Sequence, residues 1–135
     1  MNVQVREYTD EDFESVSELL KNTFGYEKAK LKDDRVYEFV SVFENQVVGY
    51  FQLVETIDII RNLKTFHVEY VCVDSNCRGK GIGHIMMEFA NDWVIKHHGN
   101  RMELTSGNQR LAAHKLYMDL GFEKRDSSIF RKEIV

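Results

Sequence analysis

Apolar residues recur at two different spacings along the chain, and each change of spacing marks a new element. Val3 and Val5 alternate with polar neighbours, which predicts a short first strand. Thr9 can cap a following helix, and Gly25 is suited to end it. The apolar residues between these two lie three or four positions apart, on one helical face: Phe13, Val16, Leu20 and Phe24.

The middle of the chain alternates between apolar strands and polar connections. Residues 36–43 and 47–54 are rich in β-branched and aromatic side chains and flank a polar turn, which predicts a hairpin. Residues 28–35 are polar and unpatterned, which is typical of a loop or a short helix. Residues 56–64 fit no single pattern, and residues 66–73 predict a strand that leads into a glycine cluster.

The C-terminal half returns to helical spacing twice. Residues 83–96 predict an amphipathic helix, residues 102–104 a short strand, and residues 108–120 a third helix with Gly121 as its cap. Residues 122–134 predict a last hairpin. The order of these elements predicts an α+β fold, or a mixed α/β fold, built around one central sheet.

Composition narrows the class of protein. Of the 135 residues, 43% are apolar and 30% are charged, which favours a single globular domain over residues 1–135. No apolar run approaches the roughly 20 residues that cross a bilayer, and the N-terminus lacks the apolar core of a signal peptide. A net charge of −4 argues against a general nucleic-acid binder. Cys72 and Cys77 suit neither a disulfide framework nor a zinc site, so we expect no metal and a cytoplasmic location.

A glycine-rich segment directly follows the strand at 66–73 and opens the helix at 83–96. Its glycines leave several backbone N–H groups free to converge on one anion, and a helix start adds roughly half a positive charge. Arg78 and Lys80 add formal charge beside them, so the segment predicts a phosphate or pyrophosphate site. A glycine-rich turn without a ligand is the alternative. The spacing matches neither a Walker A loop nor a dinucleotide fingerprint, because the glycines alternate: Gly79, Gly81 and Gly83.

Two motifs in this region carry a family resemblance. Arg78, Gly81 and Gly83 match the pattern Arg/Gln-x-x-Gly-x-Gly/Ala. Downstream, Asn108 is followed by two alanines and by Tyr-x-x-x-Gly-Phe, which begins at Tyr117. Together the motifs resemble the GNAT family of N-acetyltransferases over nearly the whole chain. The resemblance implies a central, mostly antiparallel sheet, with a splayed pair of fourth and fifth strands and helices on its flanks.

The resemblance also implies acetyl-CoA as co-substrate. The backbone of Val71, Cys72 and Val73 would pair with the pantetheine arm like an added strand. Asn108 would hydrogen-bond the same arm. Lys115 would lie near the cofactor, with a solvated helix cation as the alternative. The pyrophosphate would bind the backbone amides of one loop and helix start: Arg78, Gly79, Lys80, Gly81, Ile82, Gly83 and His84.

Transfer to an amine needs a route for the proton of the amine and a proton donor for the leaving thiolate. Tyr117 stands where the resemblance places the general acid; a buried helix aromatic is its alternative role. Glu69 is the candidate base or water relay, with an exposed ion-pair partner as its alternative role. His67 is a second candidate base, because its ordinary pKa suits neutral pH. Strict alternation puts four residues on one strand face, and a bulge would change that phase: His67, Glu69, Val71 and Val73.

The leading hypothesis is an acetyl-CoA-dependent N-acetyltransferase, an acyltransferase that acts by direct attack in a ternary complex on the primary amine of a small molecule. Two alternatives stay open: acetylation of a protein N-terminus or lysine, and a CoA-binding sensor without catalysis. The acidic net charge is compatible with a cationic acceptor. We expect residues 24–35 and 56–64 to set acceptor choice. A homodimer is also left open, because relatives often form dimers.

Overall fold

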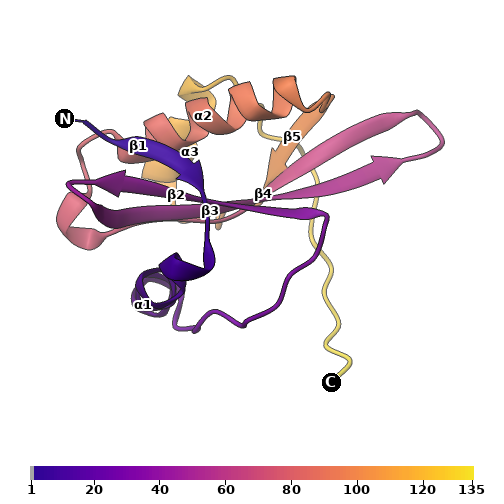
Figure 1. The fold of residues 1–135 in the computed structure, drawn as a ribbon. Coiled ribbons are helices and arrows are strands. Elements are labelled where there is room, and N and C mark those ends of the chain that lie inside the picture. The colour runs from indigo at the N-terminus through magenta and orange to yellow at the C-terminus, as the bar shows by residue number, and fades with distance from the viewer. Residues whose placement is uncertain (1) are drawn as a thin grey trace. The chain divides into compact units, whose positions relative to one another are not determined.

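The computed structural model describes residues 2–135, which fall into two compact units that divide after Thr105. Figure 1 shows the course of the chain. The elements of the first unit are β1 (Gln4–Glu7), α1 (Phe13–Phe24), β2 (Val36–Phe43), β3 (Gln46–Asp58), β4 (Leu63–Val73), α2 (Ile82–Lys96) and β5 (Arg101–Leu104). The second unit, Ser106–Val135, contains α3 (Leu111–Asp119).

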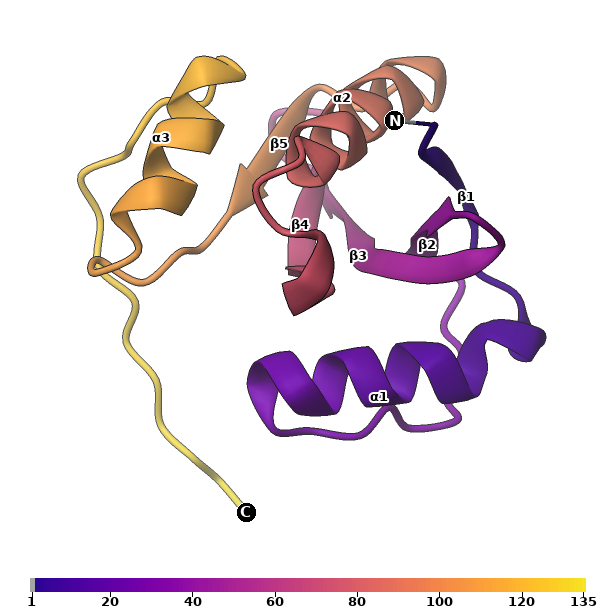
Figure 2. The same cartoon turned by 90° about the vertical axis from the view of Figure 1, so that its left-hand side faces the viewer.

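The first unit is built on one five-stranded sheet in the order β1-β2-β3-β4-β5. Three of its pairings are antiparallel, and only β4 and β5 run parallel. Helices α1 and α2 cover opposite faces of this sheet (Figure 2). Helices and strands in this arrangement confirm the predicted α+β fold with a central, mostly antiparallel sheet.

Each helix closes its own apolar core. The α1 face holds an aliphatic cluster with one tyrosine and one cysteine: Val16, Leu19, Leu20, Val40, Tyr50 and Cys72. The α2 face is aromatic, because Trp93 of α2 lies edge-on to Phe39 and Phe66, with ring centres 5.4 and 5.3 Å apart. Burial of these side chains stabilises the packing of both helices on the sheet, and each fully buried side chain contributes about 1.5–3 kcal/mol.

Gly25 ends α1 as predicted, whereas Thr9 caps a short 3-10 helix that precedes α1. The Thr9 N–H donates to Oδ2 of Asp12 at 2.8 Å, and the Asp12 N–H donates to the Thr9 carbonyl at 2.9 Å. These bonds start a short 3-10 helix, Asp10–Asp12, which leads into α1. At the other end Gly25 takes the left-handed conformation, with φ of 82°. A residue with a Cβ atom adopts that conformation only with strain.

The segment 56–64, which the sequence left undecided, closes a long hairpin of β3 and β4. Thr56 pairs with Thr65, and Asp58 pairs with Leu63 at the turn. In the turn the Asp58 side chain accepts backbone N–H bonds from the next residues, as an aspartate commonly does in tight turns. Figure 1 shows this hairpin extending past the neighbouring strands.

Two predictions for the second unit need correction. The helix predicted over residues 108–120 begins only at Leu111, after an irregular stretch that contains Asn108. The hairpin predicted over 122–134 is wrong for the chain as described, since residues 122–135 form no strand. An alternating sequence specifies a strand only where another strand accepts its hydrogen bonds, and Phe130 here stays 94% exposed.

Candidate functional site

Glycine conformation shapes the loop that joins β4 to α2. Gly79 and Gly81 have φ of 77° and 80°, a region that other residues occupy only with strain. A Cβ atom on either glycine would meet nothing within 4 Å, so the loop faces open space there. Upstream, the Asn76 N–H donates to Oδ1 of Asp74 at 2.8 Å and turns the chain away from the strand. The loop therefore presents its backbone to a ligand.

The start of α2 adds donors to this loop. The first backbone bond of the helix runs from the Ile85 N–H to the Gly81 carbonyl at 3.1 Å. The preceding N–H groups, those of Ile82, Gly83 and His84, have no acceptor within the helix and carry the positive end of its dipole. The His84 side chain bonds Glu88 of its own helix at 2.8 Å, so its backbone is the part suited to an anion.

The cations that the sequence analysis named lie in the same loop. Nε of Arg78 donates to the Val73 carbonyl at 3.4 Å, which holds the guanidinium at the end of β4. Lys80 is exposed between the two left-handed glycines. The predicted phosphate residues, from Arg78 to His84, thus share one loop and one helix start. Their backbone donors and two cations are chemically suited to a diphosphate.

One edge of β4 is open beside this loop. The parallel partner β5 pairs with β4 only from Thr65 to Val68. Across residues 2–135, the segment from Glu69 to Val73 has a strand partner on its β3 side only. The predicted splay of these two strands is confirmed. An extended ligand arm would use the backbone groups of this segment that do not pair with β3.

A β-bulge interrupts β4 just before that open edge. The register between β3 and β4 shifts between Tyr50 and Gln52, because Tyr50 faces Cys72 whereas Gln52 faces Glu69. One residue of β3 therefore stands opposite two residues of β4. One of these two, Tyr70, has φ of 54°, which is unusual for a side chain of its size.

The bulge decides which side chains share a face of the sheet. Before it, Phe66 packs against an aromatic ring of α2; after it, Cys72 packs in the cluster under α1. By alternation, His67 and Glu69 lie on the α1 face. Strict alternation predicted that these two residues share a face with Val71 and Val73. That prediction is wrong, because the extra residue of the bulge moves Val71 and Val73 to the opposite face.

The two candidate bases have different surroundings on the α1 face. Nε2 of His67 lies 3.1 Å from the hydroxyl of Thr56 on the neighbouring strand. Glu69 is exposed, and no lysine or arginine of residues 2–135 forms an ion pair with it. Its cross-strand neighbour is Gln52, a neutral side chain. Glu69 thus has a carboxylate that no internal cation occupies.

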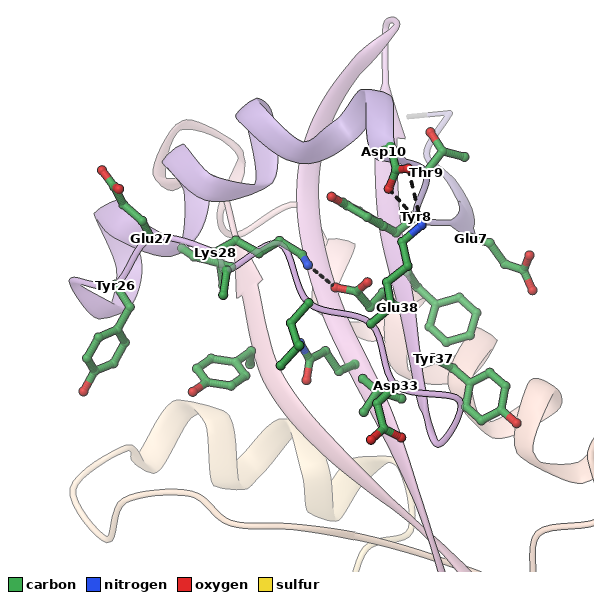
Figure 3. Close-up of a pocket in the computed structure, with 18 of the residues that line it drawn as sticks. Glu7, Tyr8, Thr9, Asp10, Tyr26, Glu27, Lys28, Asp33, Tyr37 and Glu38 are labelled. Carbon is green, nitrogen blue, oxygen red and sulfur yellow. Dashed lines mark hydrogen bonds and ion pairs between the residues drawn. The ribbon is translucent and has the colours of Figure 1, made fainter. Parts of the chain in front are cut away.

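A cavity of about 890 Å³ lies within the first unit, between the sheet, α1 and the connection from α1 to β2 (Figure 3). Residues 26–34, part of one of the two segments expected to set acceptor choice, supply much of its wall, whereas no residue of 56–64 lines it. The sequence analysis missed the strand residues Glu38 and Gln52, which form part of the wall. Isolated polar residues in a strand pattern were the available signal.

Lys28 and Glu38 form a largely buried ion pair in the wall of this cavity. Nζ of Lys28 lies 2.8 Å from Oε1 of Glu38, and the two side chains are 10% and 15% exposed. The Tyr50 hydroxyl donates to the same oxygen at 2.5 Å, and Nε2 of Gln52 donates to the Tyr50 oxygen at 2.8 Å. Burial, with the nearby Glu38 charge, raises the pKa of Tyr50, so its hydroxyl stays a donor.

In the second unit, Tyr117 is the buried residue of α3. It is 8% exposed and lies edge-on to Phe122, with ring centres 5.8 Å apart. Burial raises the pKa of Tyr117, so its phenol keeps its proton at neutral pH. Lys115 is exposed and pairs with Asp119 at 3.3 Å, which matches a solvated helix cation, and Asn108 is exposed before the helix.

No three His, Cys, Asp or Glu side chains of residues 2–135 are grouped so as to hold a metal ion. The helices described over the same range are all too short or too polar to cross a membrane.

Comparison with known proteins gives a family match over most of the chain. A family model described as the acetyltransferase (GNAT) family matches residues 2–122. The chain is also 41% identical over 59 residues to YhdJ of Bacillus subtilis (strain 168), an uncharacterized N-acetyltransferase. That match covers 43% of this chain and 41% of the relative, so it spans less than half of either protein.

Solved structures share the fold of this chain over nearly its full length. A transcriptional regulator from Bacillus halodurans C-125 has a TM-score of 0.86 and 24% identity, with 98% of this chain and 100% of that chain covered. A ribosomal-protein-alanine N-acetyltransferase from Brucella melitensis biovar Abortus 2308 has a TM-score of 0.84 and 17% identity over the same shares. Identities this low show the fold alone.

Proposed function

The chain belongs to the acetyltransferase (GNAT) family, and we propose from this premise that it transfers an acetyl group from acetyl-CoA to the primary amine of a small molecule. The observation that carries the proposal is a path of two parts in the first unit. The first part is the open edge of β4 at Val71–Val73, and the second is the loop of Gly79 and Gly81 with the first N–H groups of α2. Acetyl-CoA, the family's co-substrate, has an extended arm and a diphosphate that suit these two parts.

Each part of the path has a defined role in the proposal. The backbone of Val71, Cys72 and Val73 binds the pantetheine arm, and the amides from Arg78 to His84 bind the diphosphate. The side chains of Arg78 and Lys80 add charge. Asn108 hydrogen-bonds the pantetheine arm, a role that rests on the resemblance of its motif to that of the family. Lys115 has the weakest support, because its ammonium is already paired with Asp119.

Acetyl-CoA supplies an activated thioester, and this chain's residues move the protons. The attacking amine must be neutral, whereas a free alkylammonium has a pKa of about 10.4. Glu69, directly or through water, accepts that proton, with His67 as the second candidate. A backbone N–H near Val71 stabilises the charge that develops on the carbonyl oxygen during direct attack. Tyr117 donates a proton to the departing thiolate, for which its protonated phenol is suited.

The volume of the cavity suits a small acceptor. At about 890 Å³ it lies within the range of roughly 300–1,000 Å³ that is typical of small-molecule pockets. Carboxylates outnumber lysines in its wall, which favours a cationic amine. The similar Brucella protein is named a ribosomal-protein-alanine N-acetyltransferase, and the similar Bacillus halodurans protein is named a transcriptional regulator. Protein acetylation and a CoA-binding sensor are therefore the outcomes that the test must separate.

Calorimetry with acetyl-CoA and with CoA, followed by thiol release across a panel of amines, tests the proposal. The wild type should bind both nucleotides, and Gly81→Ala should weaken binding at least tenfold. Gly25→Ala is the matched control, because Gly25 has nearly the same φ, 82°, and also lacks neighbours near its Cβ position. Binding without turnover of any amine would favour the sensor, and turnover of peptides alone would favour protein acetylation. Equal affinity in the two variants would refute the diphosphate site.

A further inference from the structure

We propose that Glu38 selects the acceptor by holding a protonated amino group, and that Lys28 occupies this position in the free protein. The inference rests on the proposed function and names its acceptor class. The acceptor carries two amino groups, one held at Glu38 as an ammonium and one free to react. The Lys28 side chain is then a competitor built into the chain, which the acceptor displaces.

The surroundings of the Lys28 ammonium show what this part of the cavity binds. Oε1 of Glu38 lies 2.8 Å from Nζ, and the Tyr8 ring centre lies 4.8 Å from it. A carboxylate and an aromatic face are the two groups that proteins combine to hold an ammonium. In Figure 3 the Lys28 nitrogen reaches Glu38 across the cavity from the connecting loop. A primary ammonium on an alkyl chain is also what a protonated alkyl diamine presents.

Glu38 is fixed in place, whereas Lys28 is not held by regular structure. Glu38 belongs to β2, and its Oε1 accepts from the Tyr50 hydroxyl, which Gln52 in turn contacts. Lys28 lies in the loop between α1 and β2, which contains neither helix nor strand. Replacement of its ammonium by another exchanges one ion pair for a similar one. The carboxylate needs no rearrangement when that happens.

The charge of the cavity wall favours a dication. Six carboxylates line it against two lysines, Lys28 and Lys32. Lys32 is already paired with Asp10 at 3.2 Å, and both of these side chains are exposed. A wall with this excess of negative charge attracts cations and disfavours anionic acceptors. The carboxylates are Glu7, Asp10, Glu27, Asp33, Asp34 and Glu38.

The sheet register sets a distance between the held ammonium and the reacting amine. Glu38 pairs with Gln52, and Gln52 pairs with Glu69, so the three residues form a row across β2, β3 and β4. Neighbouring strands are about 4.8 Å apart, so the backbones of Glu38 and Glu69 are about 10 Å apart. An acceptor that spans this row carries its two nitrogens on one flexible chain of several methylenes.

Kinetics with matched amines test the inference. Thiol release is measured with hexane-1,6-diamine and hexan-1-amine for the wild type, Glu38→Gln, Lys28→Met and Glu55→Gln. Glu55→Gln is the matched control, because Glu55 pairs with Lys64 at 3.0 Å, is 18% exposed and lies outside the cavity wall. The wild type should prefer the diamine at least tenfold in kcat/KM. Glu38→Gln should bring that preference within twofold, and Glu55→Gln should retain it.

Lys28→Met gives the sharpest result, since removal of the competing ammonium should lower KM for the diamine at least threefold. A rise in that KM, a preference retained in Glu38→Gln, or equal use of both amines by the wild type would each overturn the inference. Thermal unfolding of each variant checks that it is folded.

Calorimetric titration of the CoA-bound protein with hexane-1,6-diamine separates this inference from the proposed function. Binding that depends on Glu38 without any thiol release would support the ammonium site and contradict acetyl transfer to amines. Acetyl transfer without diamine preference would support the transferase and contradict the role of Glu38.

Discussion

Gly49 of β3 lies beneath Met86 of α2, where a Cβ atom on residue 49 would come 2.7 Å from the Met86 sulfur. The same Cβ atom would also overlap the hydroxyl of Ser41 on the neighbouring strand. Met86 and Ser41 are both fully buried. The absence of a side chain at Gly49 therefore lets α2 approach the sheet, and that approach sets where the helix start lies relative to the end of β4.

Gly49→Ala should destabilise the protein by about 1–3 kcal/mol, because the added methyl overpacks a closed core. Thermal and urea unfolding measure the change. Gln46→Ala, at the exposed start of the same strand, is the control and should unfold within a degree or two of the wild type. Wild-type stability of Gly49→Ala would show that α2 shifts to make room for the methyl group without a cost in the free energy of unfolding.

Asp12→Asn should destabilise the fold by about 1–3 kcal/mol near neutral pH. Asp12 is buried and accepts two bonds from Arg6, at 2.8 and 2.9 Å. The Arg6 bond is the largest cause of the lowered pKa of Asp12, and the Thr9 N–H also contributes.

A carboxylate with a lowered pKa in the folded state stabilises the protein above its unfolded pKa of about 4 and loses that effect as pH falls further. Urea unfolding at pH 7, 5 and 3 should therefore show the difference between Asp12→Asn and the wild type shrinking below pH 4. A difference that grew with acid would contradict the ion pair.

Tyr117→Phe should lower kcat for acetyl transfer about 10- to 100-fold and leave the Kd of CoA within twofold. The substitution removes only the hydroxyl, so the edge contact with Phe122 and the burial of the ring are kept. Because the pKa of Tyr117 is raised, its loss of proton should not limit the rate between pH 6 and 9. An unchanged kcat would leave Tyr117 with a packing role only.

The two cysteines should differ in reactivity. Cys72 is 4% exposed, and burial raises its pKa to about 12, whereas Cys77 is only partly buried. The thiolate is the reactive form, so a thiol reagent at pH 7.5 should label Cys77 quickly and Cys72 only after unfolding. Cys77→Ala should abolish the fast phase. Two fast phases in the native wild type would contradict the packing of Cys72 under α1.

Local pattern predicted much of the fold. The spacing of apolar residues identified α1 and α2 within about a residue, and Gly25 marked the end of α1 as predicted. The last hairpin failed because its alternation lacked a partner, and the long β3–β4 hairpin was missed at 56–64 because polar side chains such as Lys64 and Glu55 pair across it.

By itself the sequence determined the elements and the glycine loop, because helix periodicity, left-handed glycines and helix starts depend on residues near one another in the chain. Tertiary structure alone decided two features of the site. The bulge that puts Val71 and Val73 on the opposite face from Glu69 depends on how β4 aligns with β3, and the meeting of Lys28 with Glu38 depends on where a loop crosses the sheet. Both arise from contacts between distant segments, whose geometry no local pattern of side chains encodes.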